Sequence, residues 1–221
     1  MPSSSPSASY TAGAEPDRTS AMRAAVELAK SYRLLNHGPT VLVSAAHGGQ
    51  RNIMAAAWNM ALDFAPPKVS LVLDKSTYTR ELVEASGHFC LNVPCRAQAG
   101  AVLALGQLSG RELRGNADGG DKFTRFGLDT VAASSCEAPL LEGCVAWLEC
   151  RLIPEPRNQQ LYDLFIGEVV AAWADTRVFA DGHWRYDDSS DPALRTLHYV
   201  AGGHFFAIGE AFETQALPPL R

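Results

Sequence analysis

Short apolar runs separated by glycine, proline and polar residues dominate the chain from residue 40 onward. Within 145–153 the side chains alternate, so that Val145 and Trp147 share one face of a strand and Ala146 and Leu148 the other. Roughly six or seven such runs predict strands. They span residues 40–46, 52–58, 69–73, 89–93, 145–153, 164–174 and 177–184, and the last bends around an Asp181-Gly182 turn and ends the series.

A glycine pair predicts how the first two strands are joined. Residues 47–50 read His-Gly-Gly-Gln, and both glycines can adopt the positive φ that a tight hairpin turn requires. The chain then returns beside its own preceding strand. We therefore expect the strand 52–58 to lie centrally in the sheet.

Three segments are typical of helices. Residues 20–34 carry Met22, Val26 and Leu34 at helical spacing behind Ser20 as a candidate N-cap, which predicts an amphipathic helix outside the sheet. Residues 79–85 and the alanine-rich 98–107 predict two more helices. The polar, glycine-rich residues 114–121 predict a mobile loop that ends at Lys122.

Strands outnumber helices, and they do not alternate with them in the way of a parallel sheet. The predicted fold class is therefore mainly β with peripheral helices, an antiparallel closed or split barrel. A chain of 221 residues with 47% hydrophobic content has enough apolar surface for one domain. We expect a disordered tail at 1–19, where large apolar side chains are almost lacking, one domain at 20–213 and a C-terminal tail at 214–221.

Charge and hydropathy exclude several classes of partner. The formal net charge is −5, without a cluster of basic residues, which argues against nucleic acid or an anionic membrane surface as a partner. No apolar run approaches the ~20 residues of a membrane-spanning helix. The N-terminus lacks the basic and apolar regions of a secretory signal, so we expect a cytoplasmic protein.

Five cysteines lie at positions 90, 95, 136, 144 and 150, without a Cys-x-x-Cys spacing or a histidine framework for zinc. We expect no metal site. The cysteines are interpreted as reduced, buried thiols that act as small hydrophobic residues.

Residues 52–58 are unusually free of bulk for a strand. The sequence Asn52-Ile53-Met54-Ala55-Ala56-Ala57-Trp58 sets three alanines beside one tryptophan, so a flat ring can approach the main chain there. Asn52 can donate and accept hydrogen bonds, and Trp58 can wall the pocket. The alternative is an ordinary core strand of small residues.

A strand-to-helix junction follows at Lys75-Ser76-Thr77-Tyr78-Thr79. The free N–H groups and the dipole at the start of the helix 79–85 favour an anion there. The hydroxyl groups of Ser76 and Thr77 also suit a simple helix cap, and the two interpretations are compatible. A site for a flat ring followed by a site for a phosphate indicates flavin mononucleotide, FMN.

Several short motifs carry a resemblance along roughly residues 36–210. In order they are Asn52-x-Met54-x-x-x-Trp58, Pro66-Pro67, Ser76-Thr77-Tyr78-Thr79, Ser86-Gly87-His88-Phe89-Cys90-Leu91-Asn92-Val93-Pro94, Ser109-Gly110-Arg111, Asp121-Lys122-Phe123, Ala138-Pro139-Leu140, Leu148-Glu149-Cys150 and Phe165-Ile166-Gly167-Glu168-Val169. Together they resemble the flavin reductase-like family, whose fold is an FMN-binding split barrel.

The resemblance implies a cofactor, a donor and an assembly. The cofactor is FMN, with FAD as the alternative flavin, and the electron donor is NADH or NADPH. Ser109, Gly110 and Arg111 would complete the binding of the phosphate or the ribityl chain, and Lys122 occupies the place of a flavin-contacting lysine. The family also implies a homodimer with each flavin near the subunit boundary.

One position departs from the pattern of the family. Many members carry a histidine five residues before the glycine of Gly-Glu-Val, on the nicotinamide side of the pocket, and here that residue is Tyr162. Tyrosine keeps an aromatic hydrogen-bonding group but does not titrate near neutrality. His204 is a second candidate for approaching the ring, with a structural histidine in a glycine-containing turn as the alternative. Glu149 and Glu168 are expected to bond turn backbone or pair with arginine.

Three functions follow from these observations. The leading one is an FMN oxidoreductase that passes electrons from NAD(P)H to a flavin or another acceptor, with a partner monooxygenase or redox protein. The second is a flavoredoxin-like carrier that exchanges electrons with a protein, which the tyrosine at 162 favours. The third is a flavin-binding protein without redox activity.

Overall fold

The computed structural model describes residues 22–114 and 120–217. The predicted tail 1–19 and the candidate cap Ser20 lie outside the described residues. So do residues 115–119 of the predicted loop and residues 218–221 of the predicted C-terminal tail.

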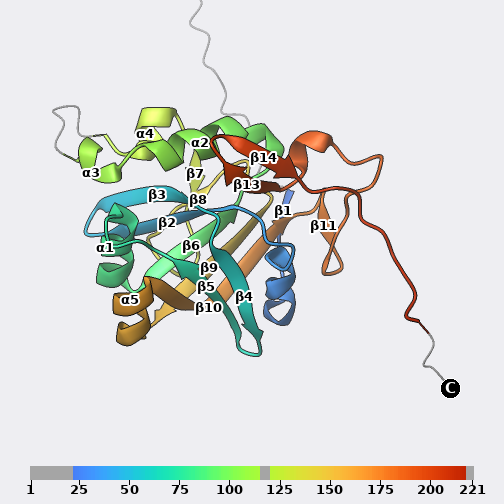
Figure 1. Cartoon of the computed structure of the whole chain (residues 1–221), viewed down its shortest axis with the longest axis horizontal. Helices are drawn as coiled ribbons and strands as arrows, with labels where there is room; N and C mark the ends of the chain where they lie inside the picture. The colour runs from blue at the N-terminus through green and yellow to red at the C-terminus, as the bar shows by residue number, and fades with distance from the viewer. Residues whose placement is uncertain (1–21, 115–119, 218–221) are drawn as a thin grey trace, which may run out of the picture.

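A single antiparallel sheet of eight strands forms the centre of the molecule (Figure 1). The order along the sheet is β3-β2-β6-β9-β10-β5-β4, and β1 pairs with β10 off this path. The strands are β1 (Arg23–Ala25), β2 (Val41–His47), β3 (Gln50–Ala56), β4 (Asn59–Phe64), β5 (Pro67–Val72), β6 (His88–Val93), β9 (Ala146–Ile153) and β10 (Leu164–Asp175).

The longest strand of the sheet is β10, with 12 residues, and it pairs with three other strands. On one edge β10 pairs with β9 along most of its length, and a register shift between Val169 and Ala171 interrupts this pairing. On the other edge its first residues pair with β5 and its last residues pair with β1. One long strand thus serves two partners on the same edge. The ends of the main path are β3 and β4, which are consecutive in the chain.

Helices and three short hairpins cover the sheet. Figure 1 shows α2, α3 and α4 together along one side of the molecule, with β13 and β14 beside α2. The helices are α1 (Tyr78–Ser86), α2 (Ala99–Gln107), α3 (Gly110–Leu113), α4 (Lys122–Phe126) and α5 (Pro156–Tyr162), with 3-10 helices η2 (Leu28–Leu34), η3 (Arg96–Gln98) and η4 (Pro192–Leu194). The hairpins are β7 (Thr130–Val131) with β8 (Leu140–Leu141), β11 (Phe179–Ala180) with β12 (His183–Trp184), and β13 (Leu197–Ala201) with β14 (His204–Ala207). Among the described helices, none combines the length and the apolar character needed to cross a membrane.

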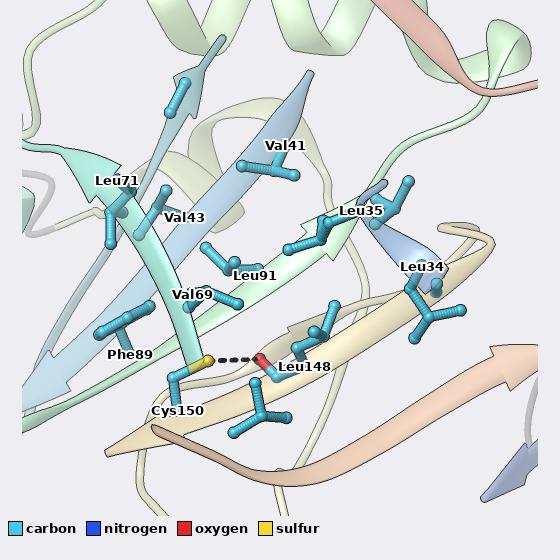
Figure 2. Close-up of a cluster of buried hydrophobic side chains, with 14 of the residues drawn as sticks. Leu34, Leu35, Val41, Val43, Val69, Leu71, Phe89, Leu91, Leu148 and Cys150 are labelled. Carbon is cyan, nitrogen blue, oxygen red and sulfur yellow. Dashed lines mark hydrogen bonds between the residues drawn. The ribbon is translucent and has the colours of Figure 1, made fainter. Parts of the chain in front are cut away.

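Alternation along the strands sorts the apolar side chains into two cores. Figure 2 shows the larger core, in which Val43 of β2, Leu71 of β5 and Leu91 of β6 meet. Its members come from six strands of the main path, so the sheet curves around one face. The second core lies on the other face, where Val102 of α2 and Phe123 of α4 cover the sheet.

The predicted class, mainly β and antiparallel with peripheral helices, is confirmed. The turn at 47–50 is present, with φ of 57° at Gly48 and 76° at Gly49. The helices predicted at 79–85 and 98–107 match α1 and α2 closely. These elements are local, so their residues alone indicate them.

Three predictions about elements were wrong. In place of one amphipathic helix at 20–34, the described part contains β1 and η2, because residues 23–25 pair with the end of β10. The strand that carries residues 52–56 is an end strand, since β3 pairs only with β2 in the sheet. The chain at 177–184 is a hairpin, and it is followed by β13 and β14 rather than ending the series of strands.

The strand β4 was not predicted at all. It follows β3 directly, and its apolar side chains Met60, Leu62 and Phe64 are exposed rather than buried. An alternating pattern signals a strand through burial on one face, but here the apolar positions face solvent. The three partly buried positions are Asn59, Ala61 and Asp63, which carry little apolar signal.

Gly167 of β10 leaves room for the ring of Phe89 and for Cys150 of the neighbouring strand β9. A Cβ at this position would lie 2.5 Å from Cζ of Phe89 and 3.2 Å from Cβ of Cys150. Phe89 is fully buried, so its ring cannot move aside. We expect Gly167→Ala to lower the free energy of unfolding by about 1–3 kcal/mol through overpacking, measured by urea denaturation.

Gly100 is the matched control. It lies in helix α2, where an added Cβ would meet no atom within 4 Å. Gly100→Ala should raise the free energy of unfolding by about 0.5–1 kcal/mol, because alanine loses less conformational entropy in a helix. If both variants changed stability in the same direction, the packing argument for Gly167 would be wrong.

Candidate functional site

A cavity of about 710 Å³ opens beside the end strand β3. This volume is within the range of small-molecule sites. Its lining comes from four parts of the chain: Met54, Ala55, Ala56, Ala57 and Trp58 of β3 and its end; Val102, Leu103, Gly106 and Gln107 of α2; Tyr199, Val200, Gly202, Gly203 and Phe205 of the β13–β14 hairpin; and Thr40, Val72, Asp74, Tyr162 and Asp163.

Small side chains keep the floor of this cavity open. Ala55 faces helix α2, where a Cβ added to Gly106 would lie 3.7 Å from Cβ of Ala55. Ala57 is exposed, and Trp58 is 76% exposed at the edge of the cavity. Because β3 pairs with β2 on one edge only, the sheet leaves main-chain groups on its other edge for a ligand. The stretch 54–58 therefore has the open shape that its composition predicts.

Asn52 and Thr79, both predicted to contact a cofactor, are buried against each other. The side-chain Nδ2 of Asn52 donates to Oγ1 of Thr79 over 2.9 Å, and the two residues are 3% and 0% exposed. A Cβ at Gly110 would lie 2.3 Å from Oδ1 of Asn52, so only glycine fits there. Ile53 is also fully buried. None of these four residues lines the cavity, and together they join β3 to α1 and α3.

The start of α1 has the features of an anion site. Thr77 is in the N-cap position, but its side chain makes no capping hydrogen bond, and its hydroxyl donates instead to O of Asp74 over 2.7 Å. Ser76 donates through N and Oγ to the Asp74 carboxylate, which lowers the pKa of Asp74. Since Asp74 lines the cavity, the helix start and the cavity are adjacent. Tyr78 is buried, and its phenol oxygen has no hydrogen-bond partner among the described residues.

Two cations stand at this end of the site. Nη1 of Arg111 donates to O of Ser76 over 2.6 Å, and Nη2 pairs with Glu81 of α1. Nζ of Lys75 lies 3.6 Å from the Asp163 carboxylate and its side chain is 62% exposed. Ser109 caps α3 by accepting from N of Arg111 over 3.3 Å, which positions that arginine. The structure thus brings the predicted residues 75–77 and 109–111 together.

Lys122 is buried rather than exposed on the surface. It is 3% exposed, and its Nζ donates to O of Ile53 over 2.9 Å and to O of Leu105 over 2.8 Å. Burial lowers the pKa of Lys122 to about 8. The ammonium group therefore ties β3 to α2, the two elements on either side of the cavity, and does not line the cavity itself.

Helix α5 ends at Tyr162, its C-cap residue is Asp163, and both residues line the cavity. Tyr162 is 65% exposed and lines the cavity, as predicted for a residue on the ring side. Asp163 adopts φ of 54° and accepts from Nη1 of the buried Arg80 over 2.5 Å. Arg80 also donates to O of Leu73 and O of Gln159. This arginine fixes the turn that places Tyr162.

His204 does not line the cavity, although its neighbours do. Gly202, Gly203 and Phe205 belong to the lining, whereas His204 is exposed on the other face of β14. Side chains alternate along a strand, so His204 and Phe205 point in opposite directions. The proposed approach of His204 to a ring is not supported by this placement.

The two glutamates have the structural roles expected of them. Burial alone would raise the pKa of Glu149, but hydrogen bonds from Ser134, Ser135 and Trp173 lower it. Glu168 pairs with Arg151 over 2.9 Å. Neither residue lines the cavity.

The cysteines are free thiols, and four of the five are buried as expected. Cys136 is the exception, since it is only partly buried. Across residues 22–114 and 120–217, no group of three or more His, Cys, Asp or Glu residues is arranged to hold a metal ion.

The lining residues of α2 were not predicted, and in the β13–β14 hairpin the sequence pointed only to His204, which is not one of them. The lining residues of α2 and of the β13–β14 hairpin follow β3 by about 50 and 150 positions, and only the fold brings them to it. The apolar, alanine-rich composition of 99–107 predicts a helix but does not say which element it covers. The Gly202-Gly203 pair was the one local signal of a close approach.

The assembled site fits a planar ligand with an anionic end. The alanine floor and Gly106 leave room for a flat ring, and the exposed main-chain edge of β3 offers hydrogen bonds to its polar rim. The start of α1, with Arg111 and Lys75 beside it, suits a phosphate. The donor set and the shape are those that a flavin nucleotide requires.

Solved structures and sequence relatives match most of the chain. The YddH protein of Escherichia coli (strain K12) is 45% identical over 188 residues, which are 84% of this chain and 94% of that protein. The crystal structure of an FMN-binding domain of a flavin reductases-like enzyme from Shewanella baltica OS155 superposes with a TM-score of 0.81 at 53% identity, covering 87% of this chain and 97% of that chain.

A more distant match is the flavoredoxin of Desulfovibrio vulgaris (Miyazaki F), with a TM-score of 0.64 at 25% identity over 80% of this chain and 90% of that chain. The family model described as the flavin reductase like domain matches residues 33–204. The resemblance in the sequence motifs is thereby confirmed, and membership of this family supports a flavin-related redox function. This chain belongs to the flavin reductase-like family.

Proposed function

We propose that this protein is an FMN-dependent oxidoreductase that takes electrons from NADH or NADPH and passes them to a second flavin or another acceptor. The observation that carries the proposal is the cavity of about 710 Å³, which has an alanine floor and lies next to an uncapped helix start flanked by cations. The Shewanella baltica structure, 53% identical to this chain, is that of an FMN-binding domain, which supports the same cofactor here.

The residues divide the work of binding. The main chain of Met54 to Ala57 would bond the polar edge of the ring, and Trp58 would pack beside it. The start of α1 and Arg111 would hold the phosphate of FMN. Asn52, Thr79 and Lys122 act indirectly, since their bonds hold β3 against α1 and α2.

The flavin supplies the redox chemistry when it is bound, because its ring accepts a hydride and releases electrons singly or in pairs. The chain itself excludes water and orients the donor. Phe205 and Leu103 cover the cavity, while the exposed Tyr162 stands at its edge. Its phenol provides a hydrogen-bond donor at the edge of the cavity.

The electron-carrier alternative rests on Tyr162. A tyrosine takes the place of the histidine that many family members carry on the nicotinamide side of the pocket, so exchange with a protein partner without NAD(P)H oxidation is the second candidate. The flavoredoxin of Desulfovibrio vulgaris has the same fold as this chain, which supports it.

We also propose that two copies of the chain form a dimer through β4. Met60, Leu62 and Phe64 are 56%, 48% and 63% exposed on an end strand of the sheet, next to Trp58 at the cavity. The register of β4 shifts at Leu62, so these side chains do not form one regular row, but exposed apolar residues grouped on an end strand are typical of an interface. A second copy seated there would bury these side chains and cover the open edge of the cavity at Trp58.

Filling the floor of the cavity should remove flavin. Ala57→Leu adds three carbon atoms where Ala57 is exposed in the cavity, so we expect FMN to bind at least about tenfold more weakly, a loss of about 1.4 kcal/mol. Flavin fluorescence titration measures the dissociation constant. Ala211→Leu, at an exposed alanine away from the cavity, is the control and should leave it unchanged. Equal affinity in Ala57→Leu would contradict the proposed ring position.

Anaerobic reduction separates the candidate functions. We expect purified protein loaded with FMN to show the oxidised flavin band and to lose it within a turnover time when NADH or NADPH is added. Bleaching by dithionite but not by either nucleotide would favour the electron carrier. Because dithionite reduces any accessible flavin, it is the positive control, and transfer of electrons from the reduced flavin to a redox protein separates the electron carrier from the flavin-binding protein without redox activity.

Charges on β4 should separate the dimer. The double variant Met60→Glu with Leu62→Lys places two charged side chains in the proposed interface, and removing them from water costs free energy. Light scattering after size exclusion should therefore give the mass of the monomer, and FMN binding should be weaker. Phe126→Glu, on helix α4, is the control for an exposed apolar residue and should leave the mass unchanged. A wild-type protein of monomer mass would refute this assembly.

A further inference from the structure

Two cysteine sulfur atoms lie close together at a place outside the lining of the cavity. Sγ of Cys90 and Sγ of Cys136 lie 3.7 Å apart, from positions separated by 46 residues. Cys90 is fully buried in β6, and Cys136 is partly exposed in the segment 132–139 that links β7 to β8. Neither residue lines the cavity or takes part in the proposed function.

The segment around Cys136 is anchored on both sides. On its N-terminal side, the Glu149 carboxylate accepts hydrogen bonds from N and Oγ of both Ser134 and Ser135. On its C-terminal side, Sγ of Cys90 donates to O of Ala138 over 3.6 Å, and Ser44 donates to O of Pro139 over 2.6 Å. Cys90 and Glu149 are opposite each other in the β6–β9 pairing, so one patch of the sheet holds the segment and the sulfur pair together.

The two sulfur atoms are close enough for a small movement to bring them to the length of a disulfide bond. A disulfide needs sulfur atoms about 2.0 Å apart, so the pair must approach by somewhat less than 2 Å. Cys90 is fixed in the sheet, whereas Cys136 lies in bends outside any strand, so the movement falls to the segment 132–139. A hydrogen bond from Cys90 lowers the pKa of Cys136 to about 7 against the opposing effect of burial, while the pKa of Cys90 is raised. The more accessible sulfur is thus also the better nucleophile.

We propose that Cys136 and Cys90 form a peroxide-reactive thiol pair that closes to a reversible intramolecular disulfide. The Cys136 thiolate attacks one oxygen of hydrogen peroxide, the O–O bond breaks, and the products are a sulfenic acid and, after protonation, water. The Cys90 sulfur then attacks Sγ of Cys136, the S–O bond breaks, and a second water leaves with the Cys90 proton. Two thiols lose two electrons in total and one peroxide gains them.

The remaining cysteines are suited to serve as internal references. Cys95 and Cys150 donate to O of Gly143 and O of Leu148, and both are buried like Cys144. Burial raises the pKa of Cys95 and Cys144, which disfavours the reactive thiolate. The proposal therefore predicts reaction at one pair and protection of three thiols.

The test treats the reduced full-length protein with a stoichiometric amount of hydrogen peroxide and counts free thiols with a chromogenic disulfide reagent under denaturing conditions. We expect two of the five thiols to be lost, a cross-linked Cys90–Cys136 peptide in the mass map without reduction, monomeric chains on a non-reducing gel, and full recovery with dithiothreitol. The experiment is run with and without added FMN. Because the thiol chemistry needs no flavin, its outcome is separate from that of the proposed function.

Three variants sharpen the result. Cys90→Ala should leave Cys136 as a sulfenic acid that a dimedone probe labels, and Cys136→Ser should slow the loss of the Cys90 thiol at least tenfold. Cys95→Ala is the control and should keep the disulfide. The proposal is overturned by wild-type protein in which Cys136 proceeds to the sulfinic acid beside a free Cys90, in which another pair or two chains become linked, or in which no thiol reacts.

Discussion

The position of β3 at the end of the sheet is the constraint on which the site depends. An end strand has one edge of its main chain without a strand partner, and here β3 ends in a run of alanines. A free edge is usually a liability, because it can pair with another chain. Two sets of buried polar bonds hold β3 in place: Lys122 ties it to α2, and Asn52 bonds Thr79 of α1. Their net effect is to fix β3 in place while its alanine end lines the cavity.

Different properties of a ligand matter at the two ends of the proposed flavin site, namely its shape at one end and its charge at the other. At the ring end, the absence of side-chain bulk at Ala55 and Ala57 creates the space, and shape decides what binds. At the phosphate end, charge decides, because the start of α1 lacks a side-chain cap and Arg111 stands beside it. Asp74 belongs to both, since it lines the cavity and holds Ser76 by two hydrogen bonds. A single strand-to-helix junction thereby sets the distance between the ring and the anion.

Buried acids and bases in this fold serve mainly to fix the chain. Glu149 is charged and fully buried, and hydrogen bonds from Ser134, Ser135 and a tryptophan compensate for its desolvation. Arg80 is also buried, and its hydrogen bond to the Asp163 carboxylate holds the turn at Asp163. Such fully bonded charges are expensive to remove because the partner groups would be left unsatisfied. The chemistry proposed for the site asks little of protein acids and bases, which agrees with their use as structural anchors.

The sequence by itself determined the local elements and the chemical character of the site. The Gly48-Gly49 turn, helices α1 and α2, the alanine floor and the helix start with its hydroxyl groups follow from neighbouring residues, whose preferences act over one or two turns of chain. Only the tertiary structure decided that β3 lies at an end of the sheet, that Lys122 is buried, that Phe205 rather than His204 meets the cavity, and that Cys90 meets Cys136. These outcomes depend on strand pairing and on contacts between residues far apart in the chain. The residues on either side of a given position do not indicate which distant residue it contacts in the fold.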